Sequence, residues 1–165
     1  MAWRLHVCLL ITLCWGLSGY AADVEVNGRT FHIPAGFALE LIAGSDLVER
    51  PIAASFDFEG NLYVTDSAGM SDRATEQIKT KPHRLRKLID RDGDGIYDES
   101  VLFAEGLMFP EGCLWYEGSV YVAAPPEIWK LTDTDGDGKA DQREVWFDGK
   151  TLTGCGNDLH GPYLG

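Results

Sequence analysis

The chain has 165 residues, of which 45% are hydrophobic and 24% charged, and its formal net charge at pH 7 is -12. This length is sufficient for one domain with a core of its own. Because so acidic a chain repels a phosphate backbone, the composition argues against nucleic acid as a partner.

The first 22 residues have the layout of a secretory signal peptide. Arg4 precedes an apolar run over 7–17, and the small residues of SGYAA follow, which predicts cleavage after Ala21. The apolar run is shorter than the roughly 20 residues that a membrane-spanning helix needs. We therefore expect an exported protein, periplasmic or in the cell envelope, whose domain covers 23–165. An uncleaved N-terminal anchor is the alternative, and other membrane association would require parts outside this sequence.

Cysteine usage leaves two alternatives open. Cys8 and Cys14 leave with the signal peptide, so the exported chain keeps Cys113 and Cys155. In an oxidising compartment these two thiols either pair or remain two separate small buried residues. The sequence contains no CxxC or CxxCH, which argues against zinc and against covalently attached haem within this stretch.

Short β-type segments fill most of the remaining chain. The sequence VEVNGRTFHI at 24–33 predicts a hairpin that turns at Asn27-Gly28, and GFALELIA at 36–43 alternates like one more strand. A polar loop at 68–82 lacks apolar periodicity, and no stretch after the signal peptide has a convincing helical period. Eight further strands are predicted over 52–56, 62–65, 84–89, 101–103, 113–115, 120–123, 128–131 and 145–147.

A repeat of 43 residues organises these strands. Asp90 and Asp133 are 43 residues apart, as are Phe103 and Trp146. Tyr63 and Tyr121 are 58 residues apart, and the 15 extra residues match the loop at 68–82. Four short strands per repeat of about 40–45 residues is typical of a β-propeller blade, whereas a β-sandwich needs no fixed period.

We therefore predict an all-β fold made of β-propeller blades, each a four-stranded antiparallel sheet. Two blades cannot close a ring. We expect the sequence to be the N-terminal part of a longer propeller, with HGPYLG at 160–165 beginning a third unit.

Two acidic loops, IDRDGDGIYDE at 89–99 and TDTDGDGKADQ at 132–142, carry the clearest chemical signal. The second has the spacing of an EF-hand-type calcium loop, in which alternate side chains converge and a glycine permits the sharp turn. Its candidate ligands are Asp133, Asp135, Asp137, the carbonyl of Lys139, Asp141 and Glu144. The first loop offers Asp90, Asp92, Asp94, the carbonyl of Ile96 and Asp98.

The first loop has Val101 where the second has Glu144, so we expect it to bind calcium more weakly. The alternative is that both loops are ordinary hairpin turns, since Asp-Gly alone favours a turn. Four converging carboxylates repel one another unless a cation compensates them. We therefore predict calcium as a structural clip between strands, without the flanking helices of a sensor EF-hand.

The sequence CGNDLHGPYLG at 155–165 places Asn157, Asp158 and His160 in one loop before a predicted inner strand. In a propeller such loops face the central channel, and a histidine beside an aspartate can act as a general base. We take His160 and Asp158 as the catalytic candidates. The alternative is a loop histidine fixed by hydrogen bonds.

Four aromatic residues, Trp115, Tyr116, Trp129 and Trp146, occur at strand spacing. They could stack on sugar rings. At this spacing we expect them in the core.

The segments at 34–69 and 90–141 together resemble the opening of the bacterial PVC-type membrane-bound dehydrogenase family, and the similarity covers 33–165. The resemblance implies an exported six-bladed propeller related to soluble glucose and sorbosone dehydrogenases. Longer members add helical repeats and a C-terminal c-type cytochrome region with CxxCH. That region is absent from this sequence, so haem is expected only beyond it.

Relatives that use pyrroloquinoline quinone have a catalytic histidine in a loop similar to NDLHGPYLG. The resemblance implies that His160 removes a hydroxyl proton from a sugar or alcohol while hydride passes to the quinone, with a cytochrome as electron acceptor. The spacing from His160 to Leu164 is one residue shorter than in the glucose enzyme. We expect a calcium-binding propeller segment of a quinoprotein-dehydrogenase-like protein. The second hypothesis is a non-catalytic propeller that binds carbohydrate or protein, with purely structural calcium.

Overall fold

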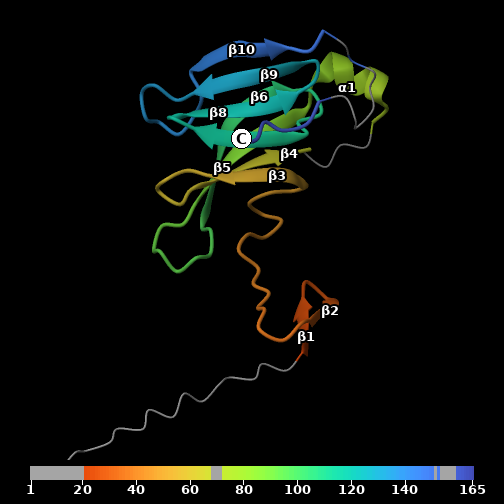
Figure 1. Cartoon of the computed structure of the whole chain (residues 1–165), viewed down its shortest axis with the longest axis vertical. Helices are drawn as coiled ribbons and strands as arrows, with labels where there is room; N and C mark the ends of the chain where they lie inside the picture. Colours follow the sequence, from red (N-terminus) through yellow and green to blue (C-terminus); the bar gives the residue numbers. More distant parts are fainter. Residues whose placement is uncertain (1–20, 68–71, 151, 153–158) are drawn as a thin grey trace, which may run out of the picture. The chain divides into compact units, whose positions relative to one another are not determined.

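The computed structural model describes residues 21–67, 72–150, 152 and 159–165, and the chain divides into two compact units between Leu41 and Ile42. The regular elements of the described chain are ten strands and one short helix (Figure 1). No helix within these ranges is long and apolar enough to span a membrane. The predicted signal peptide lies almost entirely outside the described residues.

The first unit contains a two-stranded hairpin of β1 (Ala22–Val26) and β2 (Arg29–Ile33). Asn27 and Gly28 both have positive φ, at 51° and 69°, which is the backbone of a type I′ turn. The predicted hairpin and its turn are confirmed.

The prediction of a strand at 36–43 is wrong, because the described structure has no strand there. An alternating pattern supplies the side chains of a strand. A strand also needs a neighbouring backbone to pair with, and none of the described strands pairs with this segment.

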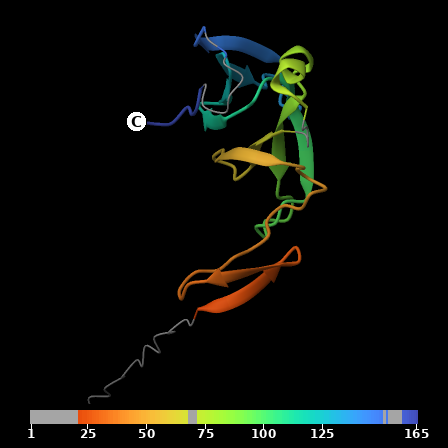
Figure 2. The same cartoon turned by 90° about the vertical axis from the view of Figure 1, so that its right-hand side faces the viewer.

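The second unit is built from two four-stranded antiparallel meanders (Figures 1 and 2). Each of the eight strands predicted for the repeats falls within one of the observed strands, with four in each sheet. The first sheet runs β3 (Pro51–Phe56), β4 (Leu62–Asp66), β5 (His83–Ile89) and β6 (Glu99–Leu107). The second runs β7 (Gly112–Tyr116), β8 (Ser119–Ala124), β9 (Glu127–Thr132) and β10 (Gln142–Asp148).

The main core lies between the two sheets. One face of each sheet contributes apolar side chains, and the edge strands β3 and β7 lie next to each other, with the Trp115 amide donating to the Ser55 hydroxyl (2.9 Å). A smaller cluster on the far face of the first sheet packs Val64 and Leu88 against Ala43 and Leu47. The buried members of the main core are Tyr63, Leu85, Phe103, Leu107, Cys113, Val120, Val122, Ala124 and Leu131.

A short helix, α1 (Ala74–Thr80), corrects the prediction of an all-β fold with a polar loop at 68–82. Its one buried residue is Gln77, so the helix has no apolar stripe to reveal it. Glu76 holds it locally by pairing with Lys79 (2.8 Å) and accepting the Thr80 hydroxyl at its carbonyl (3.1 Å). Lys81, in the left-handed conformation, ends it.

Residues 159–165, expected to begin a third unit, form no strand in the described structure. They do pass close to the second sheet, since a Cβ added to Gly112 would lie 2.2 Å from the carbonyl oxygen of Gly161.

The contribution of the core can be tested with two matched substitutions. Val122 is fully buried between the sheets, while Val145 on β10 is 48% exposed. We expect Val122→Ala to lower the free energy of unfolding by roughly 2 kcal/mol, since it removes two buried methyl groups and leaves a cavity. Val145→Ala should change it by less than about 0.5 kcal/mol. Urea denaturation measures both, and equal losses would contradict the assignment of the core.

Candidate metal centre

The two acidic loops have the same hydrogen-bonded conformation. In the first, the carboxylate of Asp90 accepts the backbone N–H groups of Gly93 (2.7 Å) and Gly95 (2.8 Å). In the second, Asp133 accepts those of Gly136 (2.8 Å) and Gly138 (2.9 Å). The first aspartate of each loop therefore folds the following five residues around its own carboxylate.

The glycines in these loops are required by the backbone. Gly93 and Gly95 have φ values of 77° and 91°, and Gly136 and Gly138 have 78° and 87°. A side chain is strained in this left-handed region, which explains the repeated Asp-Gly-Asp-Gly pattern.

A later aspartate closes each loop at its base. The carboxylate of Asp98 accepts the Arg91 amide (2.8 Å), and its own N–H donates to the Ile89 carbonyl (3.0 Å). Asp141 does the same with the Thr134 amide (3.0 Å) and the Thr132 carbonyl (3.0 Å), and it also accepts the Thr134 hydroxyl. These bonds join the end of one strand to the start of the next.

Three carboxylates converge in each loop, with ligand oxygens all within 4.8 Å of one another. The two groups are Asp90, Asp92 and Asp98 in the first loop, and Asp133, Asp135 and Asp137 in the second. These oxygens are hard ligands of the kind that calcium prefers.

The remaining predicted ligands lie at other positions in the two loops. Asp94 and Asp137 occupy equivalent positions, where their carboxylates accept the amides of Ile96 and Lys139 (both 2.8 Å). The carbonyls of those two residues belong to the same turns. Asp94 and Asp141 lie outside the two converging groups.

Glu144 is directed away from the second loop. It lies on β10 opposite Lys130, and their side chains form an ion pair (3.2 Å) that raises the pKa of Lys130. The prediction that the second loop binds calcium more tightly depended on Glu144 as a ligand, and the observed position of Glu144 does not support it. The predicted twelfth ligand belongs instead to a cross-strand pair.

Hydrogen bonds keep key carboxylates ionised. Backbone amides, that of Gly95 foremost, hold the pKa of Asp90 below its ordinary value. The Thr134 side chain and amide lower the pKa of Asp141. Both groups therefore carry negative charge at neutral pH, as a metal ligand must.

Each loop also touches the element before its own sheet, which the sequence did not reveal. The Ala140 amide donates to the Phe103 carbonyl on β6 (2.9 Å), and the equivalent Tyr97 amide donates to the Ile42 carbonyl (2.8 Å). Burial, followed by the negative charges of Asp57 and Asp133, raises the pKa of Tyr63. The second loop thus lies against the first sheet.

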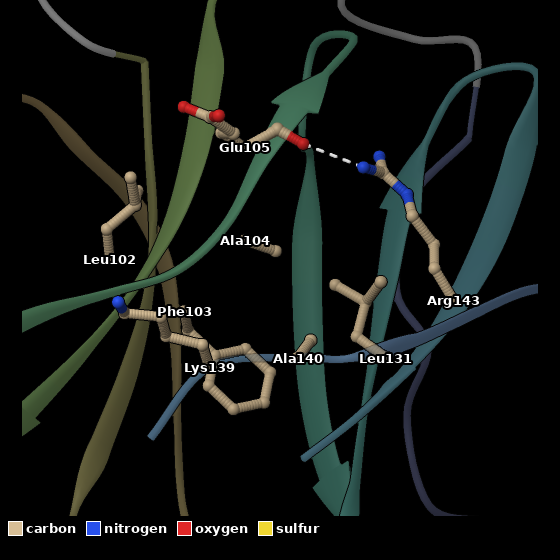
Figure 3. Close-up of a pocket in the computed structure, with 8 residues that line it drawn as sticks. All are labelled: Leu102, Phe103, Ala104, Glu105, Leu131, Lys139, Ala140 and Arg143. Carbon is tan, nitrogen blue, oxygen red and sulfur yellow. Dashed lines mark hydrogen bonds between the residues drawn. The ribbon is translucent and has the colours of Figure 1, made fainter. Parts of the chain in front are cut away.

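Arg143, which lines a cleft between β6 and β10, makes a further contact between the two sheets (Figure 3). The Arg143 guanidinium donates to the carbonyls of Glu105 (2.7 Å) and Gly106 (3.2 Å), and it lies 4.6 Å from the centre of the Trp129 ring. We assign Arg143 to holding the sheets together, because its donors are directed to the β6 backbone.

The histidine candidate lies elsewhere, beside the start of β7. His160 Nδ1 is 3.9 Å from the Glu111 carboxylate, and the His160 side chain is about half exposed. Asp158, its predicted partner, and Asn157 lie outside the described residues. The structure therefore supplies Glu111 as an acidic neighbour that sequence reasoning missed.

A buried histidine lies near this region. His83 is 3% exposed, and its Nε2 is 2.6 Å from the Gln77 side-chain oxygen, so Nε2 carries the proton. Its Nδ1 and the Ser67 hydroxyl are buried without a hydrogen bond within the described chain. Both residues line a small pocket that includes Phe109 and Glu111. This pocket and His160 lie at the end of the strands where α1 is inserted, and the acidic loops at the opposite end.

The aromatic residues divide into two groups. Trp115 and Trp129 pack on the core between the sheets, as expected. Tyr116 is 41% exposed and Trp146 57% exposed, which corrects the expectation of core positions for these two.

Cys113 is buried, and its Sγ lies 3.5 Å from the Tyr63 carbonyl oxygen. Cys155 lies outside the described residues, so the pairing alternative stays a prediction.

Comparison with known proteins gives one match. A family model described as a domain of unknown function (DUF7133) matches residues 24–161. Nothing among curated proteins or solved structures matches the chain.

The buried histidine predicts a pH dependence of stability. Burial lowers the pKa of His83 from its ordinary 6.5, so the unfolded chain takes up this proton first as the pH falls. Stability is therefore complete above about pH 6.5 and declines below it, by at most about 1.4 kcal/mol per pH unit from this group.

We expect His83→Leu to remove this part of the decline in urea titrations between pH 5 and 8. His32→Gln, in the exposed hairpin pair with Asp23, is the matched control and should leave it unchanged. An unaltered slope in His83→Leu would show that His83 is not the responsible group.

Proposed function

The chain belongs to the DUF7133 family, and we propose that it forms two calcium-stabilised blades of a β-propeller in an exported protein. The observation that carries this proposal is an aspartate loop with the same hydrogen-bonded turn, in the same place, in two consecutive four-stranded sheets. The signal-peptide pattern at 1–22 supports export to the periplasm or cell envelope.

Charge repulsion supports a cation in each loop. Three carboxylate oxygens within 4.8 Å repel strongly in the absence of a counter-ion, and the amides of each loop fold it without neutralising that charge. An oxygen-only ligand set suits calcium.

The role of the ion follows from what each loop contacts. The second loop donates a hydrogen bond to β6 of the first sheet, and the first loop donates one to Ile42. An ion that fixes the loop therefore also fixes this contact between successive elements of the repeat. In this proposal, calcium stabilises the contact between successive blades.

We expect calcium titration of the full chain to give two binding events and to raise its unfolding temperature. Asp92→Asn and Asp135→Asn preserve side-chain size and remove one charge from each loop, so each should abolish one event. Saturating a site at 100 times its dissociation constant adds about 2.7 kcal/mol of stability, which the variants should lose site by site. Isothermal titration calorimetry and thermal unfolding provide the measurements.

Asp148→Asn is the matched control. This aspartate lies on β10, beyond the loops, and its carboxylate accepts the Lys150 amide (2.8 Å). It should retain both binding events. If the two loop variants also bind two ions with unchanged affinity, the calcium sites have been assigned to the wrong residues.

We further propose that the longer propeller is a quinoprotein-dehydrogenase-like protein acting on a sugar or alcohol, with a cytochrome as acceptor. The family resemblance and the half-exposed His160 beside Glu111 support this. The carboxylate of Glu111 lies on the Nδ1 side of the ring, where it can orient the imidazole of a general base.

The residues around His160 fit the quinone poorly. Pyrroloquinoline quinone carries three carboxylates, whereas the described residues that line the neighbouring pocket include Glu111 and no lysine or arginine. We therefore derive no catalytic step through this cofactor. This mismatch favours the second candidate function, a non-catalytic propeller that binds carbohydrate or protein and uses calcium for rigidity.

One assay separates the two candidates. The longer propeller protein, supplied with pyrroloquinoline quinone and calcium, is mixed with sugars or alcohols and an electron-accepting dye. An enzyme should reduce the dye, and His160→Ala should lower the rate by about 100-fold or more, the usual contribution of a general base. His32→Ala is the control. Dye reduction that is equal in His160→Ala and the unaltered chain would remove His160 as the base, and no reduction at all favours the non-catalytic function.

A further inference from the structure

The face of the second sheet that points away from the first sheet carries a partly exposed aromatic pair. Tyr121 on β8 and Trp146 on β10 meet edge to face, with ring centres 5.4 Å apart and an angle of 81°. Trp146 is 57% exposed. Large apolar groups clustered on one face are typical of a surface that another element covers.

The first sheet has the same pair at the same positions of the repeat. Tyr63 on β4 and Phe103 on β6 meet edge to face at 5.0 Å and 85°. Phe103 is 43 residues before Trp146, and Tyr63 aligns with Tyr121 in the β4 and β8 repeats. Here both rings are covered, with exposures of 5% for Tyr63 and 3% for Phe103.

Further equivalent residues surround the two pairs. Lys87 lies over the Tyr63 ring, with its Nζ 5.7 Å from the ring centre, and Lys130 occupies the matching position 43 residues later. Leu85 in the first sheet likewise corresponds to Ile128 in the second. The two sheets thus present one surface pattern, once covered and once open.

The covered copy shows what kind of partner this pattern binds. Tyr63 and Phe103 belong to the same buried cluster as side chains of the facing sheet, among them Val120, Val122 and Leu131. The partner surface is therefore apolar, with aliphatic side chains from the two central strands flanked by Trp115 and Trp129.

The end of the described chain already lies on the open side. The Gly161 backbone approaches Gly112 of β7, and Tyr163 helps to line a depression that includes Tyr121 and Trp146. This matches the way β7 enters beside β3 to begin the second sheet.

We propose that the Tyr121–Trp146 face binds a third four-stranded sheet of the same repeat, which residues 161–165 enter as its first strand. The argument is the continuity of an interface already present in the molecule, in which the first sheet presents its aromatic pair to the apolar face of the second. The inference rests on the blade arrangement of the proposed function and specifies the residues that form the next contact.

The test extends the full chain by a copy of residues 117–150 after Gly165, which aligns Gly161 with Gly112. Hydroxyl-radical footprinting of the extended and unextended chains measures the exposure of individual side chains. We expect oxidation of Trp146 to fall by roughly tenfold, as a change from 57% exposed toward the 3% of Phe103 implies. Phe31, 41% exposed in the separate hairpin unit, is the internal control and should not change.

A second variant guards against a general effect of the extension. Trp146→Ser should remove most of the rise in unfolding temperature that the extension produces, with little effect on the unextended chain. An extension that leaves Trp146 fully oxidised, whether it folds elsewhere or remains unfolded, overturns the proposal. Concentration-dependent protection of Trp146 in the unextended chain also overturns it, because the face would then bind a second copy.

Calcium binding is measured on the same samples, with and without chelator. Protection of Trp146 without any calcium binding removes the calcium proposal and leaves this interface intact. Calcium binding without protection does the reverse.

Discussion

The carboxylate that opens each acidic loop is the constraint on which the rest of this structure depends. By accepting two backbone amides, Asp90 and Asp133 each force a tight turn that only glycine can follow at two positions. That turn brings further carboxylates together and also directs one amide outward to the preceding element. The convergence of the carboxylates and the contact between the sheets therefore arise from the same few hydrogen bonds.

Local signals in the sequence were sufficient where the structure is locally determined. Alternating apolar residues and Asp-Gly turns predicted all eight repeat strands, and Asn27-Gly28 predicted the first hairpin. Helix α1 was missed because its inward residue is Gln77, whose side chain bonds to His83, and a polar inward face produces no periodic apolar signal. The segment at 36–43 has the pattern of a strand but lacks a paired neighbour, and pairing is a non-local property.

Glu144 shows the same limit in the candidate site. The EF-hand template assumes a helix after the loop, which returns the twelfth residue toward the ion. Here the chain continues as β10, which advances about 3.3 Å per residue and carries Glu144 to a position opposite Lys130. The spacing of the aspartates was informative because the loop itself sets their geometry, whereas the position of Glu144 depends on strand pairing. The proximity of Glu111 to His160 was likewise invisible, because 49 residues separate them.

Burial of Cys113 between the sheets has a consequence for its chemistry in an oxidising environment. Burial raises the pKa of its thiol to about 12, so almost none of it is present as the reactive thiolate near neutral pH. Oxidants and disulfide-exchange partners attack through that thiolate and need access to the sulfur. When the Cys113 thiol is unpaired, a thiol reagent can modify it only while the two sheets are apart. The rate of this modification therefore measures how often the interface between the sheets opens.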